Sequence, residues 1–498
     1  MPPFVLALDM GTSSVRSLLF DRRGEPVAGT ETQRAVDLLT TAGGGVEIDP
    51  RELRDLAFAC LDETVAKAGG PIAAIGISCF WHSLLGLDAA GEPTTHVLMY
   101  SDTRSADQVD ELKTELDDDE VHDRTGCRLH SSYWPAKFRW LQASNPETFA
   151  RTVRWVAFSD YLLRQTHGFR ATSLPMAAAT GMMDVRKAEW DPEMIRAAGI
   201  SPDSLPPIVP FTALDLPLAS IFAQRWPRLA VAKWFPGVGD GVCANIGAGA
   251  VSADRIALTV GTTGALRVLA HITDMANLTI PADVFAYRIE PDSVLLGAAI
   301  SNGGKLMAWL GELTGASLEG PEMVEAGERA PDGHGLTILP FLAGERSPLW
   351  SDRVTGVITG LTLHTDKADL LRAGLESVAF RLARLYGSAR QVAADHHEII
   401  ANGGAILRSP FWLQITADAF GHPIRTLPET AEAAARGAAI LALRGIGAIK
   451  NLGDVADPAA EAPTIRPIPG HTAIYRTAIA RQTKLETLLY PNGAVWSE

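Results

Sequence analysis

The stretch FVLALDMGTSSVRSLLFD, residues 4–21, decides the fold. Aliphatic and β-branched residues flank a small, polar turn, and this pattern predicts two short strands joined by that turn. The stretch RIALTVGTTGALRVLA, residues 255–270, repeats the layout of apolar strand, Gly-Thr turn and second strand. The repeat predicts two domains of similar fold, each of which contributes one turn to a shared cleft.

Strands and helices alternate after the first hairpin. Residues 52–69, ELRDLAFACLDETVAKAG, have apolar residues at helical spacing, and residues 72–78, IAAIGIS, are typical of a buried strand. This alternation predicts an α/β fold. A run of small residues, GVGDGVCANIGAGA, ends at residue 250. We therefore expect a boundary near residue 250, between domains of residues 1–250 and 251–498.

The composition limits the classes of partner. The chain has 498 residues, of which 47% are hydrophobic and 20% charged, so it can bury large cores. Its formal net charge of −14 disfavours nucleic acid or an anionic membrane as a partner. The N-terminus lacks a basic segment, and no uncharged run of about 20 apolar residues follows. We expect a cytoplasmic protein with a small-molecule partner; the oligomeric state stays open, with a homodimer as one option.

The cysteines do not indicate a metal or disulfide framework. The four of them are far apart and form no C-x-x-C pair. Buried free thiols are expected at these positions, which are Cys60, Cys79, Cys127 and Cys243.

The first turn contains groups that suit a phosphate. Gly11, Thr12 and Ser13 offer backbone N–H and hydroxyl donors, and Arg16 adds a positive charge. Asp9, at the end of the strand, is a candidate to hold Mg²⁺ through water. An ordinary polar hairpin is the alternative reading, because short motifs have many false matches.

The second turn and a later glycine pair extend this pattern. Short or missing side chains at Gly261, Thr262 and Thr263 would let the backbone approach the β- and γ-phosphates of a nucleotide. Gly403 and Gly404 stand between a predicted strand and helix and leave a flat surface for an adenine ring. The glycine pair also suits a tight connection that needs positive φ.

Asp240 is the candidate catalytic base. It stands among glycines in GVGDG, residues 237–241, at a predicted strand end where a substrate could approach closely. There it would accept the proton of a substrate hydroxyl during phosphoryl transfer. The alternative is a turn aspartate that caps the following helix.

The order of these features resembles the FGGY carbohydrate kinases over nearly the whole chain. The motifs that carry the resemblance are residues 6–21, 237–250, 258–268, 356–382 and 401–424. Gly374, in the fourth of them, is a small departure. The resemblance implies two actin-like, ribonuclease H-like domains around a cleft, a sugar-binding one over residues 1–250 and a nucleotide-binding one over residues 251–498. It also implies ATP and Mg²⁺ as cofactors. By matching position, Asp240 becomes the base, Gly261 and Thr262 contact phosphate, and Gly403 and Gly404 face the nucleotide.

The resemblance also implies sugar-binding residues. Trp81 and His82 occupy the places of the Met and His in the Gly-Gln-Met-His-Gly segment of xylulose kinases. His82 could bond a sugar hydroxyl and Trp81 could present a ring face to C–H groups, although a lone His beside a Trp is more often part of a core. Asp102 and Arg104 match the family's Trp-x-Asp-x-Arg segment, with Tyr100 in place of Trp; they could reach the substrate or pair with each other.

A third segment, TGCRLHSSYWPAKFRWL, resembles the family stretch around a lysine. It makes Tyr133 and Lys137 candidates to line the substrate site, although Trp134 stands where a small residue or Pro is usual.

Within the family, the segments around residues 101–104 and 125–137 and the stretch FLAGERSPLW look most similar to gluconate kinases, then to xylulose kinases. We predict transfer of the γ-phosphate of ATP to gluconate, which gives 6-phosphogluconate. The carboxylate of gluconate needs a cation, for which Arg104 or Lys137 is a candidate. Xylulose, another pentulose or a polyol is the alternative substrate. A non-catalytic, actin-like sugar sensor is the alternative class, although a degenerate kinase would lack Asp240 or one phosphate turn.

Overall fold

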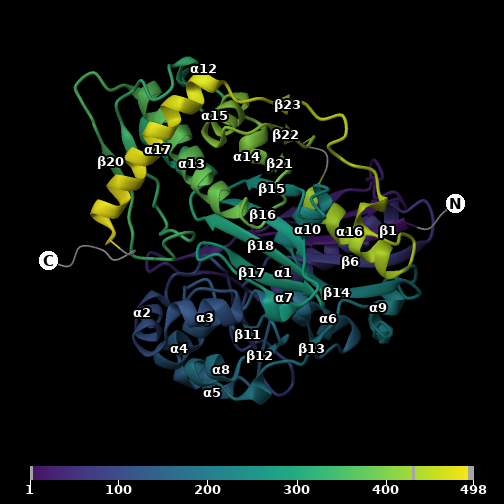
Figure 1. The fold of residues 1–498 in the computed structure, drawn as a ribbon. Helices are drawn as coiled ribbons and strands as arrows, with labels where there is room; N and C mark the ends of the chain where they lie inside the picture. Colours follow the sequence, from purple (N-terminus) through teal and green to yellow (C-terminus); the bar gives the residue numbers. More distant parts are fainter. Residues whose placement is uncertain (1–3, 429–431, 492–498) are drawn as a thin grey trace.

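The computed structural model describes residues 4–428 and 432–491, and two mixed sheets organise its two halves (Figure 1). In the first sheet β1 is antiparallel to β2 and parallel to β6, as the hairpin at residues 4–21 predicts. Its order is β14 (Lys233–Gly239), β6 (Ile72–Cys79), β1 (Phe4–Met10), β2 (Ser14–Phe20) and β3 (Thr32–Ala35).

The second sheet repeats the first. Strands β18, β16, β15, β21 and β22 have the same order and the same relative directions as β3, β2, β1, β6 and β14. The predicted repeat is therefore confirmed at the level of topology. The sheet runs in the order β17 (Phe285–Glu290), β18 (Ser293–Ile300), β16 (Gly264–His271), β15 (Arg255–Val260), β21 (Glu398–Asn402), β22 (Ile424–Thr426) and β23 (Thr464–Ile465).

Helices cover both sheets. The N-terminal half has α1 beside its sheet and a group of helices in the lower part of Figure 1. These helices are α1 (Pro50–Lys67), α2 (Ala106–Glu115), α3 (Asp118–Thr125), α4 (Trp134–Ser144), α5 (Pro146–Arg151), α6 (Phe158–His167), α7 (Leu174–Ala178), α8 (Pro192–Ala198), α9 (Ser220–Arg225) and α10 (Asp240–Gly247). The C-terminal half has α11 (Gly304–Thr314), α12 (Pro321–Glu328), α13 (Lys367–Ala389), α14 (Gly404–Leu407), α15 (Pro410–Phe420), α16 (Ala433–Gly445) and α17 (Pro469–Leu489).

Short strands complete the insertions. They pair as β4 (Leu39–Thr40), β5 (Val46–Ile48) and β8 (Val97–Leu98) in one small sheet, and as β7 (Leu85–Leu87) with β9 (Arg154–Val156), β10 (Thr172–Ser173) with β13 (Ile208–Val209), β11 (Met183–Asp184) with β12 (Glu189–Trp190), and β19 (Thr337–Leu339) with β20 (Val357–Thr359).

Helix α16 joins the two halves, although it comes late in the chain. In Figure 1 it lies beside β1 and β6 of the first sheet, and it also packs against α10. The contact requires glycine, because a Cβ atom at Gly437 would lie 1.8 Å from the Cys243 carbonyl oxygen and one at Gly76 would lie 2.2 Å from that of Ala438. The small-residue helix thus lets two backbones meet directly.

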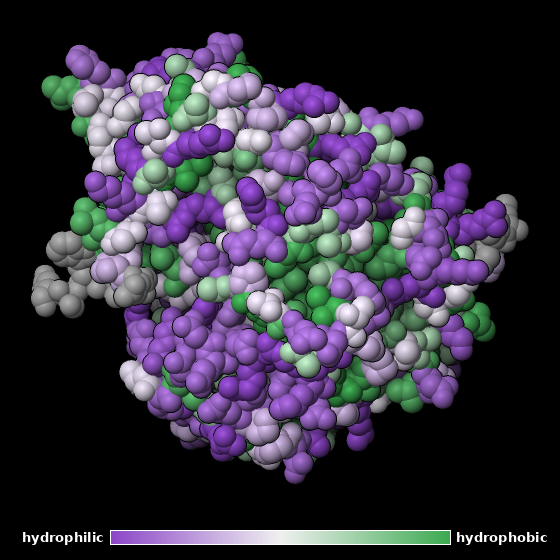
Figure 2. Space-filling view, viewed as in Figure 1, coloured by the Kyte–Doolittle hydropathy of each residue, from purple (hydrophilic) through white to green (hydrophobic). Residues whose placement is uncertain are grey.

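The cores follow the two sheets. One large apolar cluster surrounds the first sheet and includes α16, and a second lies between the second sheet and α13. On the face shown in Figure 2 most of the surface is hydrophilic, and hydrophobic side chains gather in the middle, between the two halves. Within the described residues, no helix is both long and apolar enough to cross a membrane.

Candidate active site

Each hairpin turn is closed by a backbone hydrogen bond, which joins residues i and i+3 in the first turn and residues i and i+2 in the second. The Gly11 amide donates to the Ser14 carbonyl and the Gly261 amide to the Thr263 carbonyl, at 2.9 Å in both cases. Neither hydrogen bond uses the turn side chains. The turns are thus closed by the backbone, and of their hydroxyl groups that of Thr263 is hydrogen-bonded to Tyr100.

The turns open onto one cleft between the two halves. A cavity of about 640 Å³ is lined by Thr12 and Ser13 from the first turn and by Thr262 and Thr263 from the second. The structure thus brings together four residues that the sequence assigned to phosphate. Two hydroxyl-bearing turns that face one cavity are the arrangement expected around a transferable phosphoryl group.

Two carboxylates lie at the same edge of the first sheet. Asp9 is near the end of β1 and Asp240 follows β14, and both strands run parallel to β6 between them. Burial raises the pKa of Asp9 to about 6; a hydrogen bond from Ser78 opposes this shift and the charge of Asp240 adds to it. Burial also raises the pKa of Asp240, against the charge of Arg267. The surroundings of both carboxylates therefore favour the binding of a cation or a proton.

Arg16 stands opposite Asp9 in the β1–β2 pair. Its guanidinium lowers the pKa of Asp9 and forms an ion pair with Glu432, just before α16. The positive charge of Arg16 is therefore shared with a carboxylate of the C-terminal half.

The glycines beside Asp240 make room for Trp81. The Asp240 carboxylate accepts the Gly241 amide at 2.8 Å and also the backbone amide of Trp81. A Cβ atom at Gly239 would lie 1.8 Å from the indole ring, whose Nε1 donates to the Pro175 carbonyl at 3.1 Å. The glycines were expected to admit the substrate, but the Trp81 ring occupies this space, and the Trp81 backbone amide orients the base.

The His82 imidazole is neutral, and one of its ring nitrogens is hydrogen-bonded within the protein. His82 has a positive φ of 65°, and its Nδ1 donates to the Ala179 carbonyl at 2.6 Å. Burial lowers its pKa to about 3. The Tyr133 ring packs edge-on against the imidazole at 5.1 Å, and its hydroxyl is hydrogen-bonded to that of Tyr287 at 2.8 Å. Tyr133 thus supports His82, whose Nε2 is an acceptor for a hydroxyl.

Asp102 and Arg104 pair with each other. Arg104 Nε donates to Asp102 at 3.0 Å, and its guanidinium lies over the Trp140 ring at 4.3 Å and also contacts Glu47. Asp102 accepts the Val46 amide at 3.1 Å as well. Neither residue lines the cleft. Of the two possibilities that the sequence left open, contact with the substrate or pairing with each other, the structure shows the pairing.

Lys137 is also committed to the fold. Its ammonium is buried and donates to the carbonyl groups of Met99 at 2.7 Å, Ser132 at 3.1 Å and His82 at 3.2 Å. It therefore joins three loops around the site. Lys137 has no donor left for a substrate carboxylate.

A second cavity of about 800 Å³ lies in the C-terminal half. Gly404 lines it together with the apolar side chains of Leu375 and Trp412. Gly403 has a φ of 100°, and a Cβ atom there would lie 2.5 Å from the Val260 carbonyl oxygen at the end of β15. The glycine pair thus permits a close approach beside the second turn, and the apolar walls suit an adenine ring. We call this cavity the nucleotide pocket.

The sequence did not assign two arginines, of which the structure places one at the cleft and the other near Asp240. Arg346 lines the cleft, lies over the Tyr100 ring at 5.5 Å and has a buried Nε with no hydrogen-bond partner in the described chain. Arg267, on β16, faces Asp240 closely enough to lower its pKa. Both arginines lie in motifs quoted above. For Arg267, the sequence signal was a charged residue within the otherwise apolar strand that follows the second turn.

The Tyr100 side chain lies at the cleft and near Asp240. Tyr100 lines the cavity, whereas Asp240 does not. The Tyr100 hydroxyl is hydrogen-bonded to Thr263, and burial, with a smaller contribution from the charge of Asp240, raises the pKa of Tyr100. A substrate hydroxyl that reaches Asp240 must therefore displace the Tyr100 side chain or enter when the halves are further apart.

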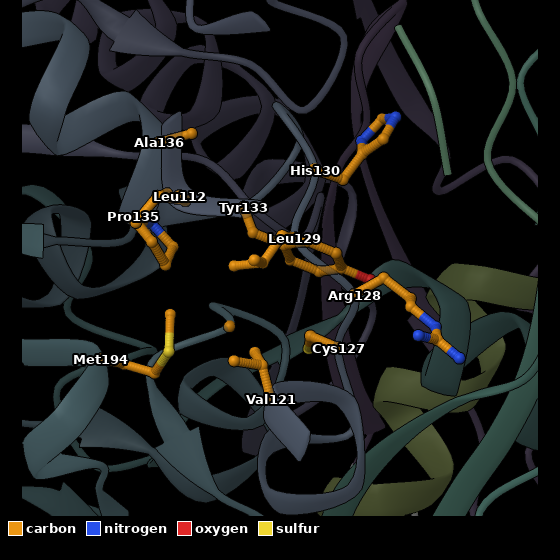
Figure 3. Close-up of a pocket in the computed structure, with 11 residues that line it drawn as sticks. Leu112, Val121, Cys127, Arg128, Leu129, His130, Tyr133, Pro135, Ala136 and Met194 are labelled. Carbon is orange, nitrogen blue, oxygen red and sulfur yellow. The ribbon is translucent and has the colours of Figure 1, made fainter. Parts of the chain in front are cut away.

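Figure 3 shows a small void beside this region, between α3, α4 and α8. Its volume is about 10 Å³, roughly the space of one water molecule. Tyr133, Leu129 and Cys127 line it, while the His130 ring points away from the other labelled side chains. The void is too small for a sugar.

Comparison with models of protein families shows which family the chain belongs to. A model of the N-terminal domain of the FGGY carbohydrate kinases matches residues 4–247, and one of their C-terminal domain matches residues 256–446. The chain belongs to the FGGY family of carbohydrate kinases. This FGGY kinase is 28% identical to the gluconokinase of Bacillus subtilis strain 168, in an alignment that covers 98% of this chain and 96% of that protein.

Solved structures agree with the family. The gluconate kinase from Lactobacillus acidophilus matches the FGGY kinase with a TM-score of 0.89 at 27% identity, over 98% of each chain. A ligand-bound xylulose kinase from the same organism also has a TM-score of 0.89, at 26% identity, over 98% of this chain and 99% of the other. The predicted family and the two-domain, actin-like α/β fold are confirmed. The FGGY kinase transfers a phosphoryl group from ATP to an alcohol group of a carbohydrate.

Proposed function

We propose that this FGGY kinase phosphorylates gluconate to 6-phosphogluconate, with Asp240 as the base. The observation that carries the proposal is the shared cleft, in which both hydroxyl-bearing turns meet near the paired carboxylates Asp9 and Asp240. In this arrangement ATP occupies the nucleotide pocket and the sugar acid occupies the cleft.

In the reaction a gluconate hydroxyl attacks the γ-phosphorus of ATP. The two turns hold the phosphate oxygens through backbone and hydroxyl donors, so that the reacting atoms are aligned. Asp240 accepts the hydroxyl proton late in the transfer, and the amides of Gly241 and Trp81 keep its carboxylate oriented. His82 accepts a hydrogen bond from another hydroxyl of the sugar.

Asp9 is the proposed Mg²⁺ residue, through water. Burial and the negative charges of Asp240 and Glu432 raise the pKa of Asp9. The carboxylate therefore has too little positive charge around it. Such a group fits a divalent cation. Bound there with ATP, Mg²⁺ would neutralise part of the charge on the phosphates.

The choice of gluconate is supported by the names of two relatives and by Arg346. The gluconokinase of B. subtilis and the gluconate kinase of L. acidophilus both cover nearly the whole chain. A sugar acid requires a cation, and with Arg104 and Lys137 committed elsewhere, Arg346 supplies one with a free Nε beside the cleft. Arg346 therefore replaces Arg104 and Lys137 as the proposed partner of the carboxylate.

Xylulose is the second candidate. The ligand-bound xylulose kinase has the same TM-score as the gluconate kinase, and His82 suits a neutral sugar as well as a sugar acid.

The cytoplasm, where ATP is supplied, is the proposed location.

A coupled ADP-release assay with Mg·ATP tests the function on gluconate, xylulose, ribulose and glycerol. Saturable turnover on gluconate is expected, with kcat reduced about 100- to 10,000-fold in Asp240→Asn. Arg346→Met should raise KM for gluconate far more than KM for any neutral sugar that is turned over. Turnover on xylulose alone would move the proposal to the second candidate, and near-normal kcat in Asp240→Asn would remove Asp240 from the base role.

A further inference from the structure

Lys305 lies where the two cavities of the kinase meet. Among the residues that the structure describes, only Thr262 and Lys305 line both the cleft and the nucleotide pocket. A phosphoryl group that moves from ATP to a sugar must cross this junction, because the two substrates occupy the cavities on either side. Lys305 is thus beside the path of that group.

The ammonium of Lys305 has no counterion. Over residues 4–428 and 432–491, its Nζ has no hydrogen bond or ion pair, and the charged neighbour that affects it is Arg346, a second cation. Burial, and then that charge, lower the pKa of Lys305. Two neighbouring cations without an anion between them are unfavourable in a partly buried place. They become favourable when a multiply charged anion binds there.

The backbone of Lys305 is fixed to the second phosphate turn. The Gly304 amide donates to the Gly261 carbonyl at 2.8 Å, and the Lys305 amide to the Thr262 carbonyl at 3.3 Å. These bonds attach the first turn of α11 to the turn at residues 261–263. The backbone from which the lysine side chain extends is therefore fixed relative to this turn.

We propose that the Lys305 ammonium contacts the phosphoryl group during its transfer and stabilises the charge on its oxygens. In this step the substrate oxygen forms a bond to the γ-phosphorus, while the bond from that phosphorus to the oxygen bridging the β-phosphate breaks. The bridging oxygen leaves with the electron pair as part of ADP, and the hydroxyl proton passes to Asp240. Lys305 neither gives nor takes a proton. The proposal rests on the positions proposed for ATP and sugar, and not on which sugar is used.

The test compares Lys305→Met, which keeps the length but not the charge, with Lys305→Arg. Lys484→Met, on the exposed side of α17, is the matched control. With whichever sugar supports turnover, Lys305→Met should lower kcat about 100-fold, the usual effect of removing one donor to a developing negative charge. Lys305→Arg should retain most of kcat, and Lys484→Met should equal the unaltered enzyme.

Binding separates a role in transfer from a structural role. ADP with aluminium fluoride mimics the phosphoryl group in flight, so Lys305→Met should weaken its binding about as strongly as it lowers kcat, while binding of ADP alone changes little. Equal losses for both would overturn the proposal, because Lys305 would then only anchor the nucleotide. Unchanged binding of the fluoride complex would overturn it too. If Lys305→Met does not fold, Lys305→Gln with the same two measurements takes its place.

Discussion

At the scale of single residues, the site depends on which charges are neutralised inside the protein and which are left for ligands. Arg104 and Lys137 are held by protein acceptors, whereas Arg346 and Lys305 line the cleft and form no ion pair within the described residues. The sequence placed Arg104, Lys137 and Arg346 in family-like segments and Lys305 in none, and it could not tell a cation that is paired within the protein from one that is not. That difference arises from contacts between segments far apart in the chain.

Arg267 controls the ionisation of the base. Asp240 must be ionised to accept a proton, and the pKa of Asp240 is raised by burial and lowered by Arg267. Removing the charge in Arg267→Met should raise this pKa further, so the acid limb of kcat/KM against pH should move to higher pH, with a lower plateau. The profile is measured at saturating Mg·ATP. Arg267→Lys keeps a charge and should shift the limb less; an acid limb that does not move in Arg267→Met contradicts this role.

At the scale of elements, local sequence patterns predicted the hairpins, α1, β6 and the strand before Asp240, because these follow from apolar spacing and turn residues. The path of α16 was not predicted. Its small residues indicate a close packing partner, but only the folded chain shows that the partners are α10 and the first sheet. Likewise, the Gly-Asp-Gly motif indicated a close approach without naming the Trp81 ring as the group that approaches.

The contact between α10 and α16 positions the base. Gly437→Ala would place a Cβ atom 1.8 Å from the Cys243 carbonyl oxygen on α10, and helix backbones cannot yield cheaply. We expect the variant to be less stable by about 1–3 kcal/mol and to have a lower kcat, since α10 begins at Asp240. Gly387→Ala is the matched control, because Gly387 lies in α13 with open space around it. There alanine should be neutral or stabilise by up to about 1 kcal/mol.

Urea unfolding and steady-state kinetics measure both variants. A Gly437→Ala enzyme with the stability and kcat of the unaltered enzyme would show that the two helices can separate without cost. That result would leave α16 as a covering helix with no influence on the base.

At the scale of the whole molecule, segments of the C-terminal half reach across the cleft onto the N-terminal half. Asp352 accepts the Ser131 hydroxyl at 2.8 Å, and Arg353 pairs with Asp110 at 2.8 Å. The Arg353 pair is exposed, and such pairs are worth only about 0–1 kcal/mol. Together with the hydrogen bond between Tyr100 and Thr263, these contacts join the two halves across the cleft.

Closure should therefore depend on ligands. An open form admits ATP and the sugar, and the closed form excludes water that would otherwise accept the phosphoryl group. Small-angle scattering of Asp240→Asn, which binds both substrates without turnover, should give a smaller radius of gyration with Mg·ATP and gluconate together than with neither. Arg353→Met should enlarge the ligand-free form but not the doubly bound one. Equal radii with and without both ligands would mean that the cleft does not close as a whole, and Tyr100 alone would then have to move to admit the sugar to Asp240.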